Sequence, residues 1–276
     1  MNLPDVQSQP DLRQIPIPAV GVAPVEVPIR FGDGRAPAAA SVGLFTDLAP
    51  DVKGTHMSRM VELIMAWRRE PVTARTLFAL LDETRSRLGA RTARVSVAFR
   101  HFVEKEAPVT GKAALVPYDV ELLAAVEDDE RQLGWRLGAV VTTLCPCSEA
   151  ISDYGAHNQR GTLSVATAFR DTRELPLVDG FLTQLEQLGS CPLYTLLKRP
   201  DEKWVTEAAY RTPKFVEDVL RDTVLWLQAQ PEVGWFAVKV SNDESIHPHN
   251  AVAYYDRALV DPQWTRPALF WWDHRL

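Results

Sequence analysis

The order of predicted elements runs twice through the chain, and this repeat limits the fold more than any other feature of the sequence. Each half reads as two strands, two helices and two more strands, although the halves share little sequence. Thr212 is the expected N-cap of the last helix, with Pro213 in its first turn. The predicted strands are 25–31, 38–48, 93–104, 113–123, 135–143, 161–169, 235–240 and 251–255, and the predicted helices are 58–69, 73–88, 178–188 and 213–228.

Two such modules in tandem predict an α+β fold. We expect a Pro-rich, extended lead-in at residues 1–24, a first module at 25–128 and a second module at 129–276. The second module holds most of the residues with reactive side chains. The two halves of the chain are therefore expected to share an architecture but not a chemical role.

Composition excludes several classes of protein. The chain has 276 residues and a net charge of -6, which argues against a nucleic-acid-binding surface because such a surface needs clustered Lys and Arg. No apolar run approaches the roughly 20 residues that cross a bilayer, and the start lacks the pattern of a signal peptide. Three cysteines do not make a disulfide framework. We expect a cytoplasmic protein without a nucleic-acid or membrane partner.

The strongest chemical signal lies between the first two strands of the second module. Cys145-Pro146-Cys147-Ser148-Glu149 and Asp153-Tyr154-Gly155-Ala156-His157 gather two thiols, two carboxylates and an imidazole. The Cys-x-Cys spacing strains a direct disulfide and presents two sulfurs to one metal ion or one substrate. An exposed turn or half of a structural zinc site is the alternative, but only Cys191 and His247-Pro248-His249 could complete such a site. The pattern therefore favours a metal site with an open position.

Two candidate carboxylates, Glu202 and Glu217, lie outside the cysteine segment. Glu217 shares a helical stripe with the apolar Leu220, Val224 and Leu227, where a carboxylate is costly unless it binds something. Metal ligation or acid–base work is one interpretation, and a helix-start carboxylate favoured by the macrodipole is the other. Glu202 lies in the charged run 198–203, which by itself reads most simply as a solvated loop.

The segment 143–160 resembles the prokaryotic type IB GTP cyclohydrolases. Further blocks of the chain are similar to motifs of that family, in the same order, so the resemblance covers nearly the whole sequence. These blocks are Met1–Ser8, Gly54–Arg59, Leu197–Lys203, Phe215–Asp218 and Glu244–His249.

The resemblance implies a tunnelling fold, in which subunits join their antiparallel sheets into a barrel. It also implies a homo-oligomer, as a tetramer, with active sites near the subunit interfaces. The implied reaction converts GTP and water to 7,8-dihydroneopterin triphosphate and formate, the first step of pterin and folate synthesis; one subfamily feeds queuosine precursors from the same product. One divalent metal ion per site, either zinc, manganese or iron, would activate the water.

The family pattern, combined with local context, assigns roles to single residues. The expected metal ligands are Cys145, His157 and Glu202, with the Asp153-Tyr154 turn orienting the His157 ring. The expected catalytic residues are Cys145, Cys147, Glu217 and His247. The expected substrate-binding residues are Glu244 for the guanine ring and Lys198, Arg199 and Arg59 for the triphosphate.

Two other functions remain open from the sequence. The related nitrile reductase of queuosine synthesis shares the fold and a nucleophilic cysteine, but it uses NADPH and needs no metal. A noncatalytic guanine- or pterin-binding protein would bind GTP without releasing formate. A purely structural zinc module ranks lowest, because metal removal would then unfold the chain.

Overall fold

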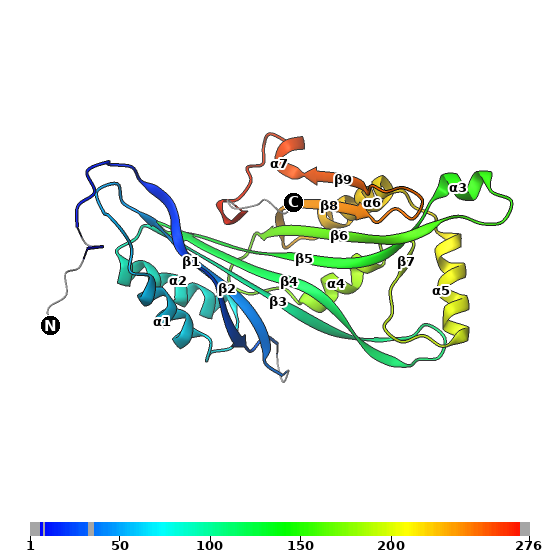
Figure 1. Ribbon diagram of the computed structural model, residues 1–276, viewed down its shortest axis with the longest axis horizontal. Helices are drawn as coiled ribbons and strands as arrows, with labels where there is room; N and C mark the ends of the chain where they lie inside the picture. The colour runs from blue at the N-terminus through cyan, green and yellow to red at the C-terminus, as the bar shows by residue number, and fades with distance from the viewer. Residues whose placement is uncertain (1–5, 8, 33–35, 271–276) are drawn as a thin grey trace. The chain divides into compact units, whose positions relative to one another are not determined.

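The computed structural model describes residues 6–7, 9–32 and 36–270 (Figure 1). The chain forms one sheet with the strand order β1-β2-β3-β4-β5-β6-β8-β9, and β7 pairs with β5. The strands are β1 Ile17–Ile29, β2 Ala38–Leu48, β3 Thr92–Glu106, β4 Ala113–Glu127, β5 Glu130–Leu144, β6 Asn158–Phe169, β7 Cys191–Pro192, β8 Val233–Asn242 and β9 Ala251–Asp256. The helices are α1 Met57–Trp67, α2 Ala74–Leu88, α3 Pro146–Ile151, α4 Val178–Glu186, α5 Arg199–Arg211, α6 Val216–Gln228 and α7 Arg257–Val260, and a 3-10 turn follows at Ala268–Phe270.

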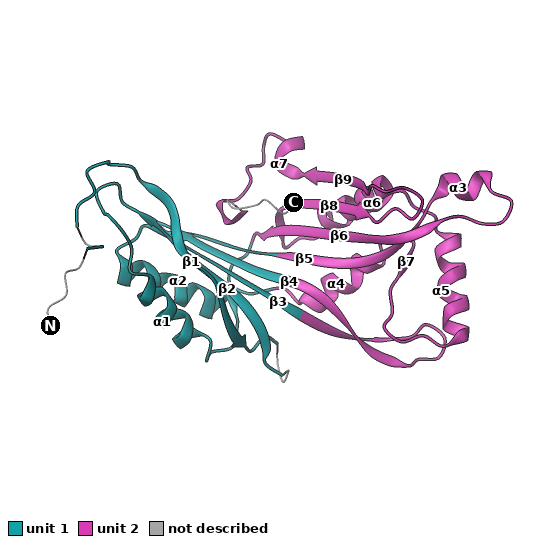
Figure 2. Ribbon diagram, in the orientation of Figure 1, with its two compact units in different colours: residues 1–100, 121–135, 171–175 teal, residues 101–120, 136–170, 176–276 magenta. Residues whose placement is uncertain are grey.

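The chain divides into two compact units (Figure 2). Unit 1 comprises residues 1–100, 121–135 and 171–175, and unit 2 comprises residues 101–120, 136–170 and 176–276. The strands β3, β4 and β5 each contribute residues to both units. These units group residues that lie close in space, whereas the predicted modules follow the repeated order of elements along the chain. The module division at 25–128 and 129–276 therefore stays a prediction.

Unit 1 contains the first strand pair and the first two helices in the predicted order. Strand β2 pairs antiparallel with β1 and with β3, and α1 and α2 bury their apolar stripes. Those stripes include Met60, Leu63, Ile64, Leu77 and Leu81. The helix α2 begins at an N-cap, Thr73, and ends at Gly89. The sequence therefore predicted both helices correctly, because each has a continuous apolar face.

The first strand begins earlier than predicted. Residue Ile17 already pairs with Leu48, so β1 includes part of the segment that the sequence suggested was an extended lead-in. The register shifts between Val22 and Val25, around Pro24. A proline is tolerated in a sheet at such an irregularity, since it cannot donate a ladder hydrogen bond. The prolines therefore interrupted the sequence pattern without ending the strand.

Unit 2 is built on an antiparallel ladder of β6, β8 and β9. The helix α6 packs against β8 and β9 through the buried residues Val216, Val219, Thr223 and Leu227. In its described part, the chain has no helix that is both long and apolar enough to cross a membrane.

Two helices of unit 2 differ from the sequence prediction. The helix α5 occupies a segment that was expected to be a charged loop. Only Asp201 and Ala209 are buried on it, so no apolar stripe revealed it. The helix α6 begins at Val216 with Phe215 as N-cap, three residues later than expected, and Thr212 instead ends α5.

Candidate functional site

The two expected metal ligands of the cysteine segment lie side by side in unit 2. Cys145 directly follows β5 and precedes the short helix α3, and His157 directly precedes β6. The backbone N–H of Cys145 donates to the carbonyl of His157 at 3.1 Å. The excursion between the two residues therefore closes on itself, and it brings the backbone of His157 back to that of Cys145 at one end of the strand pair.

Two hydrogen bonds of the Ser148 side chain hold this excursion in shape. The Ser148 hydroxyl donates to the Cys145 carbonyl at 3.2 Å and accepts from the backbone N–H of His157 at 3.1 Å. Cys145 is half-buried, whereas Cys147, in the first turn of α3, is exposed. The two thiols therefore differ in access to solvent although they are two residues apart.

The His157 ring is held by residues that the sequence analysis did not name. The Nδ1 atom lies 3.0 Å from the Gln159 side-chain oxygen and 3.4 Å from the Ser245 hydroxyl. The expected orienting turn does not perform this role, because Asp153 and Tyr154 are exposed and Tyr154 is 100% accessible to solvent. The signal for Gln159 was available, because residues two apart in an extended segment point to the same face.

The segment between β8 and β9 also approaches His157. The Ser245 contact brings the adjacent Glu244 to the neighbourhood of the imidazole, and the Asp243 N–H donates to the Arg160 carbonyl at 2.9 Å. His247 is exposed and stacks on His249, with ring centroids 5.1 Å apart. Glu244 and His247 therefore stand on the same connection, with Glu244 next to the residue that contacts His157.

The start of α6 lies beside the cysteine as well. The backbone N–H of Lys214 donates to the Leu144 carbonyl at 3.0 Å, one residue before Cys145. Glu217 follows in the first turn of α6. It is exposed, so the expectation that it occupies a buried apolar stripe is wrong. The helix buries the face of Val216 and Val219 instead, which turns Glu217 toward solvent at the end of the helix nearest Cys145.

The start of α5 holds the remaining expected ligand and two expected phosphate-binding residues. Lys198 is the N-cap of α5, and Arg199 and Glu202 lie in its first turn. All three residues are exposed. Lys214, which contacts Leu144, follows the opposite end of α5. At a rise of about 1.5 Å per residue, the helix places Glu202 roughly 15 Å from the end that leads to Cys145.

A buried carboxylate anchors this helix start. Asp201 has no accessible surface, and it accepts hydrogen bonds from the backbone N–H groups of Lys198, Val109 and Thr110 and from the Thr110 hydroxyl, all at 2.7–2.9 Å. Burial raises the pKa of Asp201, but these hydrogen bonds outweigh burial and lower the pKa to about 2. The carboxylate therefore ties α5 to the loop between β3 and β4.

The donor chemistry of the pair fits a divalent metal, but the third ligand is not in place. A thiolate and an imidazole are ligands for zinc or iron, and the two residues that carry them are joined here by a backbone hydrogen bond. Within residues 6–7, 9–32 and 36–270, no group of three or more His, Cys, Asp or Glu side chains is close enough to hold a metal ion. Cys145, His157 and Glu202 therefore stay predictions as metal ligands, and only the first two lie beside each other in the backbone.

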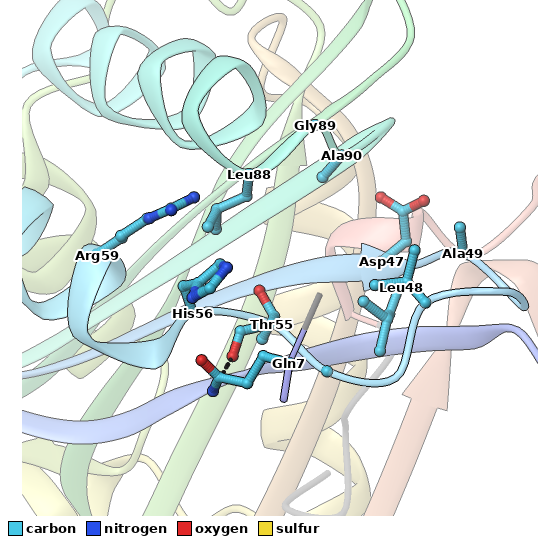
Figure 3. A pocket seen from close by; sticks show the side chains of 12 residues that line it. Gln7, Asp47, Leu48, Ala49, Thr55, His56, Arg59, Leu88, Gly89 and Ala90 are labelled. Carbon is cyan, nitrogen blue, oxygen red and sulfur yellow. Dashed lines mark hydrogen bonds between the residues drawn. The ribbon is translucent and has the colours of Figure 1, made fainter. Parts of the chain in front are cut away.

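Arg59 lies in unit 1, at a pocket of about 270 Å³ (Figure 3). Its walls come from the start of α1, the end of α2 and the segment after β2. Arg59, His56 and Thr55 lie toward one side of the pocket in Figure 3, and Asp47 and Ala49 lie toward the other. Thr55 is 7% exposed. The pocket thus offers both a cation and a carboxylate.

Comparisons with known proteins agree with this architecture. A family model described as type I GTP cyclohydrolase folE2 matches residues 3–253. A GTP cyclohydrolase FolE2 from Pelobacter propionicus is 41% identical over 256 residues, covering 91% of this chain and 97% of that protein. One from Cupriavidus necator is 42% identical over 257 residues, covering 92% and 95%.

Among solved structures, a uricase from Arthrobacter globiformis superposes with a TM-score of 0.50 at 8% identity, covering 92% of this chain and 97% of that one. At that identity the likeness concerns the fold alone, and the expected tunnelling fold is confirmed. The family model matches residues 3–253, and the two relatives are 41% and 42% identical over 91% and 92% of the chain. The protein therefore belongs to the type I GTP cyclohydrolase (FolE2) family.

Proposed function

We propose that the Cys145–His157 pair is the chemical centre at which this chain converts GTP and water to 7,8-dihydroneopterin triphosphate and formate in folate synthesis. The observation that carries the proposal is the 3.1 Å backbone hydrogen bond between Cys145 and His157. That bond holds the backbones of a cysteine and a histidine together within a chain of this family. Membership of the family supports the reaction, and the backbone contact supports the choice of these two residues.

Cys145, His157 and Glu202 are proposed to hold one divalent cation, which is zinc, manganese or iron. When bound, such a cation lowers the pKa of a coordinated water toward about 7 and so supplies a hydroxide equivalent. Glu202 would have to approach the pair, because it stands near the far end of α5 in this structure.

The protein's own residues would move protons and orient the substrate. Glu217 is proposed as the general acid–base group, because it stands exposed at the end of α6 nearest Cys145. His247 would donate to the developing oxyanion or transfer a proton, and the exposed thiol of Cys147 would contact substrate or relay a proton. Water addition at C8, release of that carbon as formate and closure of the new ring each need such transfers.

Substrate selection is assigned to other residues. Glu244 is proposed to accept the N1 and N2 hydrogens of guanine, a two-point contact that adenine cannot offer. Lys198, Arg199 and Arg59 are proposed to bind the triphosphate, since each is exposed. We further propose a homotetramer, and we propose the cytoplasm as its compartment, where thiols stay reduced.

The test is to incubate metal-stripped protein with GTP, with and without manganese, iron or zinc, and to measure formate together with pterin fluorescence after oxidation. We expect both products only when metal is restored. Cys145→Ala should abolish both, whereas Cys191→Ala, at a buried thiol on β7, serves as the matched control and should retain them. GTP binding without formate under every metal would contradict the proposal and favour a binding protein.

A further inference from the structure

The strand that follows His157 carries a buried amide that nothing in the proposed reaction uses. Gln159 is the second residue of β6 and is 8% exposed. Its side-chain oxygen lies 3.0 Å from Nδ1 of His157, and its side-chain nitrogen donates to the hydroxyl of Thr143 at 2.9 Å. Thr143 has no accessible surface and precedes Cys145 by two residues on β5. Both ends of the amide are therefore held.

We infer that Gln159 is a positioning residue that keeps His157 in the tautomer protonated at Nδ1, so that Nε2 presents its lone pair to the metal ion. The inference rests on the proposed function, because it concerns how a proposed ligand is oriented. A neutral imidazole carries one proton, and an oxygen beside Nδ1 places that proton on Nδ1. The lone pair is then on Nε2, the other ring nitrogen.

The opposite orientation of the amide would have the opposite effect. If the Gln159 side chain were rotated by half a turn, its nitrogen would donate to Nδ1, and the ring proton would have to be on Nε2. An Nε2–H cannot ligate a metal. The Thr143 hydroxyl can accept from the amide nitrogen or donate to the amide oxygen, so Thr143 alone does not choose between the two states. The orientation found is the one that leaves Nε2 able to bind metal.

Backbone hydrogen bonds fix the main chain of His157, so the Gln159 contact can control the orientation of the ring. His157 is bound through its carbonyl to Cys145 and through its N–H to Ser148, so the main chain under the ring is fixed. The remaining freedom is rotation of the ring about its side-chain bonds, and the Gln159 contact restrains that rotation. Ser245 also approaches Nδ1, but at 3.4 Å it is the weaker partner and can act as either donor or acceptor.

The experiment measures cobalt binding by the full-length, metal-stripped protein. Cobalt(II) alone is titrated while its visible absorption is recorded, and zinc affinity is then read by competition. Gln159→Leu should weaken metal binding by about 10- to 100-fold and change the cobalt spectrum, as expected when the partner of a ligating histidine is lost. Gln159→Glu keeps an acceptor at Nδ1, so it should bind close to the unchanged protein.

Two further variants separate orientation from mere packing. Thr143→Val removes the hydroxyl that holds the amide without changing the size of the side chain, so it should weaken binding less than Gln159→Leu. Ser245→Ala should have the smallest effect. Melting curves of each metal-stripped variant check that the fold is retained, and if Gln159→Leu does not fold, Gln159→Glu and Thr143→Val still test the inference.

The outcomes also distinguish this inference from the proposed function. If unchanged protein binds cobalt and His157→Ala abolishes binding, but Gln159→Leu binds normally, only the positioning role is wrong. The same holds if Ser245→Ala causes the larger loss. If unchanged protein binds no cobalt, the metal site itself is wrong, and the positioning role falls with it.

Discussion

The neighbouring helices α5 and α6 begin with similar capping hydrogen bonds, but the two capping aspartates have different structural roles. In each helix a first-turn aspartate binds a backbone N–H three residues earlier: Asp201 binds Lys198 at 2.9 Å, and Asp218 binds Phe215 at 3.0 Å. Asp201 is completely buried and also binds the loop between β3 and β4, whereas Asp218 is half-buried and pairs with Arg221 on its own helix.

The difference shows that the same capping aspartate can make tertiary hydrogen bonds at one helix start and only local contacts at another. At α5 the aspartate fixes the helix to another part of unit 2, and Glu202 stands exposed beside it. At α6 the tertiary tie is a backbone bond from Lys214 to Leu144, and Glu217 is the exposed carboxylate. The sequence offers a similar pair of carboxylates at both starts, and only their surroundings distinguish an anchor from a cap.

The largest effect is expected at the exposed carboxylate of α6. Glu217→Gln should lower kcat by about 10²- to 10⁴-fold, the usual contribution of a general acid–base group, while bound metal is retained. Steady-state formate release and metal analysis measure the two quantities. Asp218→Asn, at the next residue, is the matched control and should leave kcat unchanged. Loss of metal from Glu217→Gln would instead make Glu217 a ligand.

The corresponding residue of α5 should affect metal rather than turnover. Glu202→Gln should weaken zinc binding by more than about tenfold, because losing a ligand costs at least as much as losing its supporting partner. Competition with a chelator gives the affinity. Glu207→Gln, on the same helix and paired with Lys203 and Arg211, is the control. Unchanged affinity in Glu202→Gln would leave Cys145 and His157 without this third ligand.

Of the two capping aspartates, Asp201 should make the contribution to the free energy of unfolding that depends more strongly on pH. Asp201→Asn should lower the urea midpoint of unfolding near neutral pH, because the amide nitrogen cannot accept the hydrogen bonds that the carboxylate accepts. The native pKa of about 2 lies below the unfolded value near 4, so the carboxylate stabilises the fold above pH ~4 and loses this effect as pH falls toward 2.

Midpoints measured between pH 7 and pH 2.5 would test this. The gap between unchanged protein and Asp201→Asn should be constant above pH ~5 and should narrow below pH ~4. A gap that widens on acidification would contradict the sign of the shift.

The smallest effect is expected at the cap of α6. Asp218→Asn should cost less than about 1 kcal/mol of unfolding free energy, because the amide oxygen can still accept the hydrogen bond from Phe215. Urea denaturation at pH 7 measures it. If Asp218→Asn lowered the midpoint as much as Asp201→Asn, burial would not be what separates the two helix starts.

The parts of the fold with a regular apolar face were predictable from sequence. The helices α1, α2, α4 and α6 each repeat buried residues at helical spacing. The helix α5 could not be found in that way, because its buried residues are one aspartate and one alanine. Its Pro200 in the first turn and the acidic residues after it were the available signals.

The candidate site was predictable to a similar degree. Cys145 and His157 bracket one connection between strands, so the backbone contact between them could be expected from the sequence. The orientation of Glu217 could not, since a one-residue shift of the buried stripe moves it from core to solvent. The contacts of Gln159 and Ser245 with His157 depend on side-chain geometry that local spacing only suggests.

The closed excursion between Cys145 and His157 has a consequence for protein engineering. Its base is fixed by backbone hydrogen bonds, whereas residues 151–154 at its tip are exposed. Lengthening a loop whose ends are already joined costs little, since each doubling adds only about 0.6 kcal/mol of closure entropy. A short peptide tag or reporter inserted between Asp153 and Tyr154 should therefore leave the spacing of the two donors unchanged.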